Sequence, residues 1–388
     1  MKITKYILLI ISVSILWACN DSTVYPDVKN LPVKALDLNI SNIRLAYPMP
    51  DGSIVVPVDK DSALAVARVS PDGSFTLSET LPLKYTTYFI ANSAGESLMY
   101  NYIFSDDLGY SVIKLDEYGS IAYNGQIEGY VPITLLDNGD IAYIKQESVN
   151  GSLTEKPVMH IVGKNFKYVM ARDFYCSDAF AYDDKILMYN YSGDYCIFNT
   201  NGTYVNKGSL GRDIYKIFYA DGFLYLITIA QIDFTIDELL EQPEETGVTE
   251  WGITKMDDQG NQIFTSTVSS LALFGNFSTD EKNIIVTGAI STDYKKGEGY
   301  GAIFLLNKDS GTLEETIALD YVDCDLLPIY IVPNKKAGYI VYTLRRNNFD
   351  EVTTELKDFA HIDNGKLYIY TTNDLHKLQI NNNINNQQ

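Results

Sequence analysis

The chain has 388 residues, of which 46% are hydrophobic and 21% are charged, as in ordinary folded globular proteins. Its 30 Lys and Arg residues against 50 Asp and Glu residues give a net charge of −20 at pH 7, which argues against nucleic acid as a partner, because that affinity rests on neutralising phosphates. The composition also excludes collagen, a disulfide-stapled miniprotein and a long disordered chain.

The N-terminal segment, residues 1–18, has the pattern of an export signal. Lys2 and Lys5 give it a positive start, and the apolar stretch 7–17 is too short to span a bilayer as a mature helix. The sequence LWAC then ends at Cys19 and resembles the lipobox of bacterial lipoproteins, in which the cysteine receives lipid and becomes the new N-terminus. The alternative is an ordinary secretory signal followed by a chance cysteine.

Residues 19–34 follow as the lipidated cysteine and a polar, Pro-containing tether. Several acyl chains on Cys19 would give stable anchoring, and the resemblance implies the cell outer membrane, with the leaflet left open. A ring-shaped fold also needs a closing strand. Both 33–40 (VKALDLNI) and 375–380 (LHKLQI) are candidates, and the sequence does not choose between them.

The body of the chain is built from two kinds of hairpin that alternate. Runs rich in Tyr, Ile, Val, Phe and Thr are broken by Gly, Asn and Asp, which predicts strands and tight turns. The first kind is a turn leading into an apolar strand, as at residues 51–58, 137–145 and 221–228. The second kind has an Asp/Asn-x-x-Gly-like turn between two strands, at residues 66–77, 110–123, 195–205, 251–264, 302–315 and 358–370, with a degenerate copy at 158–169.

Two hairpins per repeat make four strands, and four strands recurring at about 38 to 60 residues define a propeller blade. We therefore predict an all-β chain with a single β-propeller over residues 35–380, with seven four-stranded blades (six or eight being the alternatives), followed by a disordered tail at 381–388. The sequences IKLDEYG (113–119) and TKMDDQG (254–260) resemble the blade repeat of secreted β-propeller lipoproteins of the Bacteroidetes. That resemblance implies a fold and no particular activity.

In such a blade, with strands A to D counted from the axis outward, the A–B and C–D turns share one face of the ring, called here the turn face. The B–C and D–A connections share the opposite face, called here the loop face. The long, dissimilar segments are all B–C connections: 105–109, 147–156, 231–250, 291–301 and 345–357. Variable loops on a rigid scaffold carry function, so the loop face is the predicted binding face. One connection contains a short acidic helix candidate at 233–245, which we interpret as a solvated excursion.

Aromatic residues gather on the predicted loop face, where they would stack on sugar rings or other flat ligands. Arg345 is added because its guanidinium can clamp a carboxylate or phosphate, although nearby acidic residues offer it surface ion pairs instead. The predicted ligand-binding residues are Tyr85, Tyr130, Tyr175, Tyr215, Trp251, Phe277, Tyr321 and Arg345. The alternative is that most of the aromatic residues pack one blade against the next, since Tyr and Phe are favoured strand residues.

No catalytic or metal-binding motif stands out. The three histidines, His160, His361 and His376, fit no zinc pattern, and no nucleophile motif occurs. The Asp/Asn–Gly turns recur in most repeats, which indicates turn chemistry rather than calcium binding. After Cys19, three cysteines remain, an odd number that predicts a free thiol. Cys176 and Cys196 would lie about 10 Å apart, beyond disulfide reach.

We expect no cofactor and no metal. The leading hypothesis is a lipid-anchored binding module that captures a glycan or other small nutrient and hands it to an outer-membrane transporter. The alternatives are a protein-interaction scaffold in an envelope complex and, third, a glycan-active enzyme with paired carboxylates.

Overall fold

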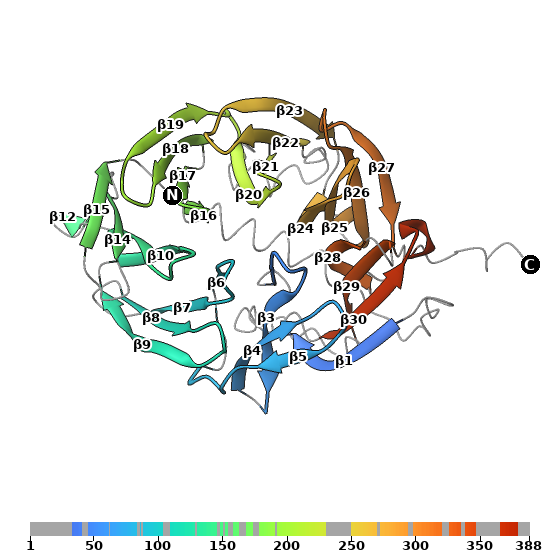
Figure 1. The fold of residues 1–388 in the computed structure, drawn as a ribbon, viewed down its shortest axis with the longest axis horizontal. Helices are drawn as coiled ribbons and strands as arrows, with labels where there is room; N and C mark the ends of the chain where they lie inside the picture. The colour runs from blue at the N-terminus through green and yellow to red at the C-terminus, as the bar shows by residue number, and fades with distance from the viewer. Residues whose placement is uncertain are drawn as a thin grey trace, which may run out of the picture.

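The strands form a closed ring of antiparallel sheets arranged radially around an axis, which is the β-propeller architecture (Figure 1). The predicted all-β single propeller is confirmed. The structure is a computed structural model that describes residues 33–40, 46–61, 63–83, 86, 88–103, 109–128, 130–145, 148–149, 152–153, 158–162, 168–173, 178–190, 192–229, 250–269, 272–293, 298–319, 326–334, 338–346 and 365–378.

Five four-stranded sheets, numbered here as units 2 to 6 in chain order, follow one another around the ring. In each sheet the strands follow one another in chain order from the axis outward (Figure 1). Unit 2 has β6 (Tyr88–Ala91), β7 (Ser97–Ile103), β8 (Gly109–Leu115) and β9 (Ile121–Glu128). Unit 3 has β10 (Tyr130–Leu135), β11 (Ile141–Lys145), β14 (Val158–Val162) and β15 (Tyr168–Asp173). Unit 4 has β16 (Asp178–Tyr182), β17 (Lys185–Tyr189), β18 (Asp194–Asn199) and β19 (Tyr204–Ser209).

Unit 5 has β20 (Asp213–Ala220), β21 (Phe223–Ile229), β22 (Glu250–Asp257) and β23 (Gln262–Ser269). Unit 6 has β24 (Ala272–Thr279), β25 (Asn283–Asp293), β26 (Glu298–Asn307) and β27 (Leu313–Ala318). A small hairpin of two-residue strands, β12 (Ser148–Val149) and β13 (Ser152–Leu153), lies between β11 and β14 in the chain.

The first and last units share a single eight-stranded sheet. Unit 1 comprises β2 (Tyr47–Pro48), β3 (Ile54–Lys60), β4 (Ala63–Val69) and β5 (Phe75–Leu77), and unit 7 comprises β28 (Leu326–Asn334), β29 (Gly338–Arg346), β30 (Gly365–Thr372) and β1 (Val33–Ile40). Counted as hydrogen-bonded sheets, the described ring therefore has six members, which is one of the two alternatives predicted beside seven. Counted by packing, each of the seven units has its own hydrophobic cluster against the next.

The fusion of the two units has a local cause. The inner strand β2 is only two residues long and pairs with β3 at Val55 and Ile54. The rest of that edge of β3 would stay unpaired, and the end of β1 fills it through the pairs Asn39↔Asp59 and Ile40↔Val58. An open strand edge is thereby removed.

The N-terminal strand β1 closes the ring. It pairs with β30 from Val33↔Tyr370 to Ile40↔Gly365, so the first of the two predicted closing segments is the one used. Leu36, Leu38 and Ile40 are buried between units 7 and 1. The second candidate forms the 3₁₀ helix η3 (Leu375–Leu378), which buries Leu375 and Leu378 between units 6 and 7.

Burial follows the radial position of each strand. In unit 4, every residue of β17 is buried, while the outer strand β19 has no buried residue. The second and third strands of the unit are covered by the neighbouring units on both faces and are the most buried, whereas the innermost strand β16 has only two buried residues. Cys196 lies in the third strand of this unit and is buried, as predicted.

Several predictions concern residues outside the described ones. These are the export signal 1–18, Cys19, the helix candidate 233–245 and the tail 381–388, together with Cys176 and Cys324. The strand β1 begins at Val33, so the last two residues of the range 19–34, predicted as a tether, belong to a strand, and residues 19–32 lie outside the described ones. Among the described residues, no helix is long and apolar enough to cross a membrane.

Removing β1 should open the ring. We compare a chain that starts at Val33 with one that starts at Ser41. The second loses the burial of Leu36, Leu38 and Ile40, about 1.5–3 kcal/mol each, and leaves the edges of β30 and β3 unpaired. We expect its thermal midpoint to fall by about 10 °C or more, or its transition to lose cooperativity, in circular dichroism melts. Equal midpoints for the two chains would contradict closure by β1.

Candidate functional site

Five of the eight predicted ligand-binding side chains lie beyond what the structure describes. The backbone places Tyr130 at the start of β10 and Arg345 near the end of β29, both on the loop face. The other three are in connections outside the described residues: Tyr85, Tyr175 and Tyr321.

The remaining three belong to the packing between units 5 and 6. Trp251 has no solvent exposure, and its ring meets that of Phe304 edge to face at 5.4 Å. Phe277 is 5% exposed and stacks on Phe218 at 4.6 Å. Tyr215 is partly buried against the same hydrophobic cluster. Trp251 and Phe277 therefore offer no surface to a ligand, and for these two the packing alternative holds.

An aromatic cluster in unit 2 does offer surface. Tyr88 opens the inner strand β6 and is 47% exposed. Its ring stacks on that of Tyr100 from β7 at 4.6 Å and 9°, and Tyr100 meets Tyr110 from β8 edge to face at 5.8 Å. Both arrangements suit the quadrupoles of aromatic rings, so the exposed ring of Tyr88 is held firmly in place.

A carboxylate from unit 4 is close to this cluster. Asp178 is the first residue of the inner strand β16, at the loop-face end. Its negative charge adds to the burial that raises the pKa of Tyr88 and of Tyr100. The inner strand β10 lies between β6 and β16 and contacts both (Figure 1). We call Tyr88, Tyr100, Tyr110 and Asp178 the axial aromatic–acid cluster.

Asp178 is an exposed residue, although protein atoms surround its carboxyl group. Burial raises its pKa to about 6, against hydrogen bonds that favour the charged form: Ala179 N–H donates to Oδ1 at 2.8 Å and the Tyr189 hydroxyl donates to Oδ2 at 3.2 Å. A carboxyl group with such a pKa changes charge near neutral pH and marks a candidate functional residue.

A second polar group lies on the inner strands of units 5 and 6. Lys216, in β20, donates from Nζ to Oδ1 of Asn276, in β24, at 3.1 Å. Its ammonium lies 5.4 Å from the ring centre of Phe218, and burial lowers its pKa to about 8.

Asn276 connects these units to the closure of the ring. The side chain is 2% exposed, and Nδ2 donates to the carbonyls of Ile329 in β28 at 3.0 Å and of Ala46, just before β2, at 3.3 Å. Together with Lys216, one amide thus ties units 5, 6, 7 and 1 near the axis. Every polar atom of this buried side chain has a partner, as buried amides require.

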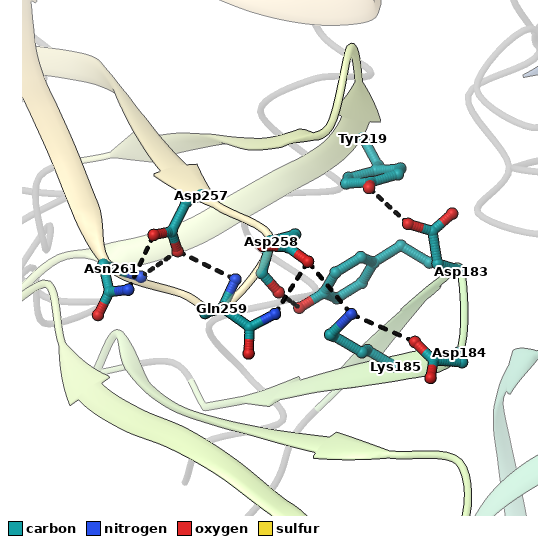
Figure 2. Close-up of polar contacts among 9 residues, drawn as sticks. Asp183, Asp184, Lys185, Tyr219, Asp257, Asp258, Gln259 and Asn261 are labelled. Atoms are coloured by element: carbon teal, nitrogen blue, oxygen red, sulfur yellow. Dashed lines mark hydrogen bonds and ion pairs between the residues drawn. The ribbon is translucent and has the colours of Figure 1, made fainter.

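The turn face carries ion pairs that join one unit to the next, as Figure 2 shows for units 4 and 5. Lys185 Nζ lies 3.2 Å from Oδ1 of Asp184 and 3.4 Å from Oδ2 of Asp258. The Tyr219 hydroxyl donates to Asp183 Oδ2 at 2.5 Å. Asp183 has φ of +47° in the tight turn between β16 and β17, a conformation that Asp tolerates better than most residues. These acidic side chains are occupied in holding the turns together.

The recurrent Asp-x-x-Gly turn uses its carboxylate internally. Asp257 Oδ1 accepts the backbone N–H of Gln259 at 3.0 Å and of Asn261 at 2.8 Å, and Gly260 has φ of +79° (Figure 2). Burial opposes ionisation of Asp257, but these hydrogen bonds hold its pKa below the usual value. This supports the interpretation as turn chemistry. Among the described residues, no group of three or more His, Cys, Asp or Glu side chains is placed to hold a metal ion.

The residues predicted from the sequence do not include Tyr88, Asp178, Lys216 or Asn276. A signal existed for the charged ones. Asp178 and Asp213 begin consecutive inner strands, and Lys216 interrupts an otherwise apolar strand, DIYKIFYA. The carbonyls to which Asn276 donates are 53 and 230 residues away in the chain, so no local sequence pattern predicts its role.

Comparison with known proteins supplies no family. No family model matches the sequence, and no curated protein does. Similar solved structures include BamB from Moraxella catarrhalis, at 12% identity and TM-score 0.45 over 88% of this chain and 99% of that one. The WD40 β-propeller domain of Doa1 has the same identity and TM-score over 89% of this chain and 96% of that one. The WD40 domain of coronin from Toxoplasma gondii shares 10% identity at TM-score 0.45, over 93% and 91%. No functional argument follows from likenesses this distant.

The Asn276 tie should contribute strongly to stability. Asn276→Ala removes three inter-unit hydrogen bonds in a buried site, two donated to the Ile329 and Ala46 carbonyls and one accepted from Lys216, at a cost of about 2–3 kcal/mol. The matched control is Asn206→Ala, which removes one exposed inter-unit bond, from Nδ2 to the Gln259 carbonyl, and should cost about 1 kcal/mol or less. Urea unfolding measures both. A smaller loss for Asn276→Ala than for Asn206→Ala would contradict the tie.

The raised pKa of Asp178 predicts a pH dependence. Its folded pKa of about 6 lies above its unfolded value near 3.9, so the protonated form is favoured in the fold, and stability is lost as pH rises from about 4 through 6. Asp178→Asn removes this loss. We expect the variant to melt higher than the parent at pH 7.5 and close to it at pH 4, with a modest difference because solvent reaches the side chain. If the melting temperature of the parent rose relative to that of the variant as pH rises, the raised pKa of Asp178 would be contradicted.

Proposed function

We propose that this chain is an exported lipoprotein, anchored to the outer membrane through Cys19, whose β-propeller is a binding module for a glycan or another small nutrient. The axial aromatic–acid cluster on the loop-face side carries the proposal. The ring of Tyr88 is nearly half exposed and held by Tyr100, and the carboxylate of Asp178 lies near it.

This combination suits a sugar ring. Carbohydrates present apolar C–H faces and a rim of hydroxyls, so a flat exposed aromatic side chain and a nearby charged acceptor supply the two contacts that they need. The strands joined by the long B–C connections end on the same face of the ring, and variable loops there would extend the site outward. The lipobox-like LWAC sequence and the polar segment after it support the anchoring.

A protein-interaction scaffold is the second candidate, and a different surface favours it. Three apolar side chains are exposed on outer strands: Phe75 on β5 at 40%, Tyr204 on β19 at 53% and Ile263 on β23 at 50%. They belong to different units, so a partner using them would contact the rim of the ring rather than its axis.

The binding module predicts a ligand-dependent thermal shift for residues 20–388 against a panel of glycans and small nutrients. A ligand at 100 times its dissociation constant stabilises by about 2.7 kcal/mol. Tyr88→Ala should weaken binding at least about tenfold, or about 1.4 kcal/mol, because it removes the stacking surface.

The matched control is Tyr118→Ala, since Tyr118 is 82% exposed but lies on the turn face between β8 and β9. It should leave the shift unchanged. Asp178→Asn should weaken binding without lowering stability at pH 7.5, which separates a binding role from a structural one. No shift across the panel, or equal effects of the two tyrosine variants, would contradict the proposal and favour the scaffold.

A further inference from the structure

The chain enters the ring at the turn face. Strand β1 runs antiparallel to β30, with Val33 opposite Tyr370 near the end of β30 and Ile40 opposite Gly365 at its start. Lys34 Nζ donates to the carbonyl of Asp72, in the β4–β5 turn, at 3.2 Å. Because that turn belongs to the turn face, the N-terminal end of β1 lies there as well.

The C-terminal end of the described chain is on the same side. β30 ends at Thr372, and η3 follows at once, with the Thr372 hydroxyl donating to the Asp374 carbonyl at 2.7 Å. His376 Nε2 lies 3.4 Å from Glu315 of β27. Both ends of the ring-forming chain therefore leave at the turn face, and neither interrupts the loop face.

We propose that the turn face is directed toward the lipid bilayer and that the loop face, with the axial aromatic–acid cluster, is directed away from it. This inference rests on the proposed anchoring through Cys19. Residues 20–32 connect that cysteine to β1; fully extended they reach at most about 45 Å, and as a flexible chain they span about 20 Å on average.

The length of β1 makes the opposite orientation costly. Its eight residues separate the two faces by about 26 Å. If the loop face were directed toward the bilayer, the tether would have to run back along the outside of the ring over that distance before reaching lipid. The distance of about 26 Å between the faces exceeds the average span of the tether and is more than half of its fully extended length.

Charge does not provide the attraction to lipid. The turn face carries Asp183, Asp184, Asp257 and Asp258 in one inter-unit contact alone (Figure 2), which disfavours contact with anionic headgroups. The tether therefore sets the orientation, and the turn face is held at a distance from the lipid rather than inserted in it.

Energy transfer from protein to bilayer tests this. Donor dyes are placed on cysteines introduced at Asn201, on the turn face between β18 and β19, or at Ser192, on the loop face between β17 and β18; both residues are exposed and belong to unit 4. The background carries Cys176→Ser and Cys324→Ser and keeps the buried Cys196. The lipidated protein is reconstituted in phosphatidylcholine vesicles with acceptor dyes on the headgroups.

We expect transfer from position 201 to be at least about twice that from position 192, because the two positions differ in height by about one strand length. Lengthening the tether by twenty Gly/Ser residues after residue 30 should reduce that difference. Equal transfer from the two positions, or greater transfer from position 192, would overturn the proposed orientation.

Two further measurements separate this inference from the function on which it rests. Mass spectrometry of the purified N-terminus reports whether Cys19 carries lipid. Residues 20–388 with an N-terminal hexahistidine tag, held on nickel-chelating phosphatidylcholine vesicles, report the orientation that this tether imposes without native lipid. If Cys19 carries no lipid but the tagged protein still shows greater transfer from position 201 than from position 192, the proposed lipid anchor is wrong and the proposed orientation holds. Failure to bind glycans would affect neither measurement.

Discussion

The closure of the ring by β1 is the constraint on which the rest of the structure depends. A propeller is a linear array of hairpins until its ends are joined, and here the joining strand precedes the first unit in the chain. Because β1 pairs with β30 and also fills the free edge of β3, units 7 and 1 become one sheet. Three buried apolar side chains of one strand thus hold together segments more than three hundred residues apart.

The outer strand β1 closes the ring at its rim, and the hydrogen bonds of Asn276 join the same units near the axis. Asn276 reaches the carbonyls of Ile329 and Ala46, so the two units fused by β1 are also joined to unit 6 near the axis. A buried amide is costly unless every polar atom is paired, which makes its partners specific. The apolar clusters between units would tolerate some sliding, since hydrophobic contact is not directional. The amide fixes the relative positions, and Lys216 extends the same network to unit 5.

The architecture could be read from the sequence because it is repetitive. Each Asp-x-x-Gly turn repeats one local chemistry, seen in Asp116 and Asp257 alike, and the period alone implies a propeller. The fusion of the end units could not be foreseen, since it follows from the shortness of β2. The candidate site was harder still: aromatic residues that pack, such as Trp251, and one that is exposed, Tyr88, look the same in the sequence. Which of them faces solvent depends on the neighbouring unit.

The two faces differ in how freely they can change. On the turn face, side chains of one unit are bound to the next: Ser93 donates to Asp137, and Lys308 pairs with Asp221. A longer turn there would break a contact between units and loosen the ring. The connections of the loop face differ greatly in length from one unit to the next, and a change of loop length costs little when the ends are held by a rigid scaffold. Loop length and sequence are therefore free to vary on the loop face, while the opposite face maintains the closed ring.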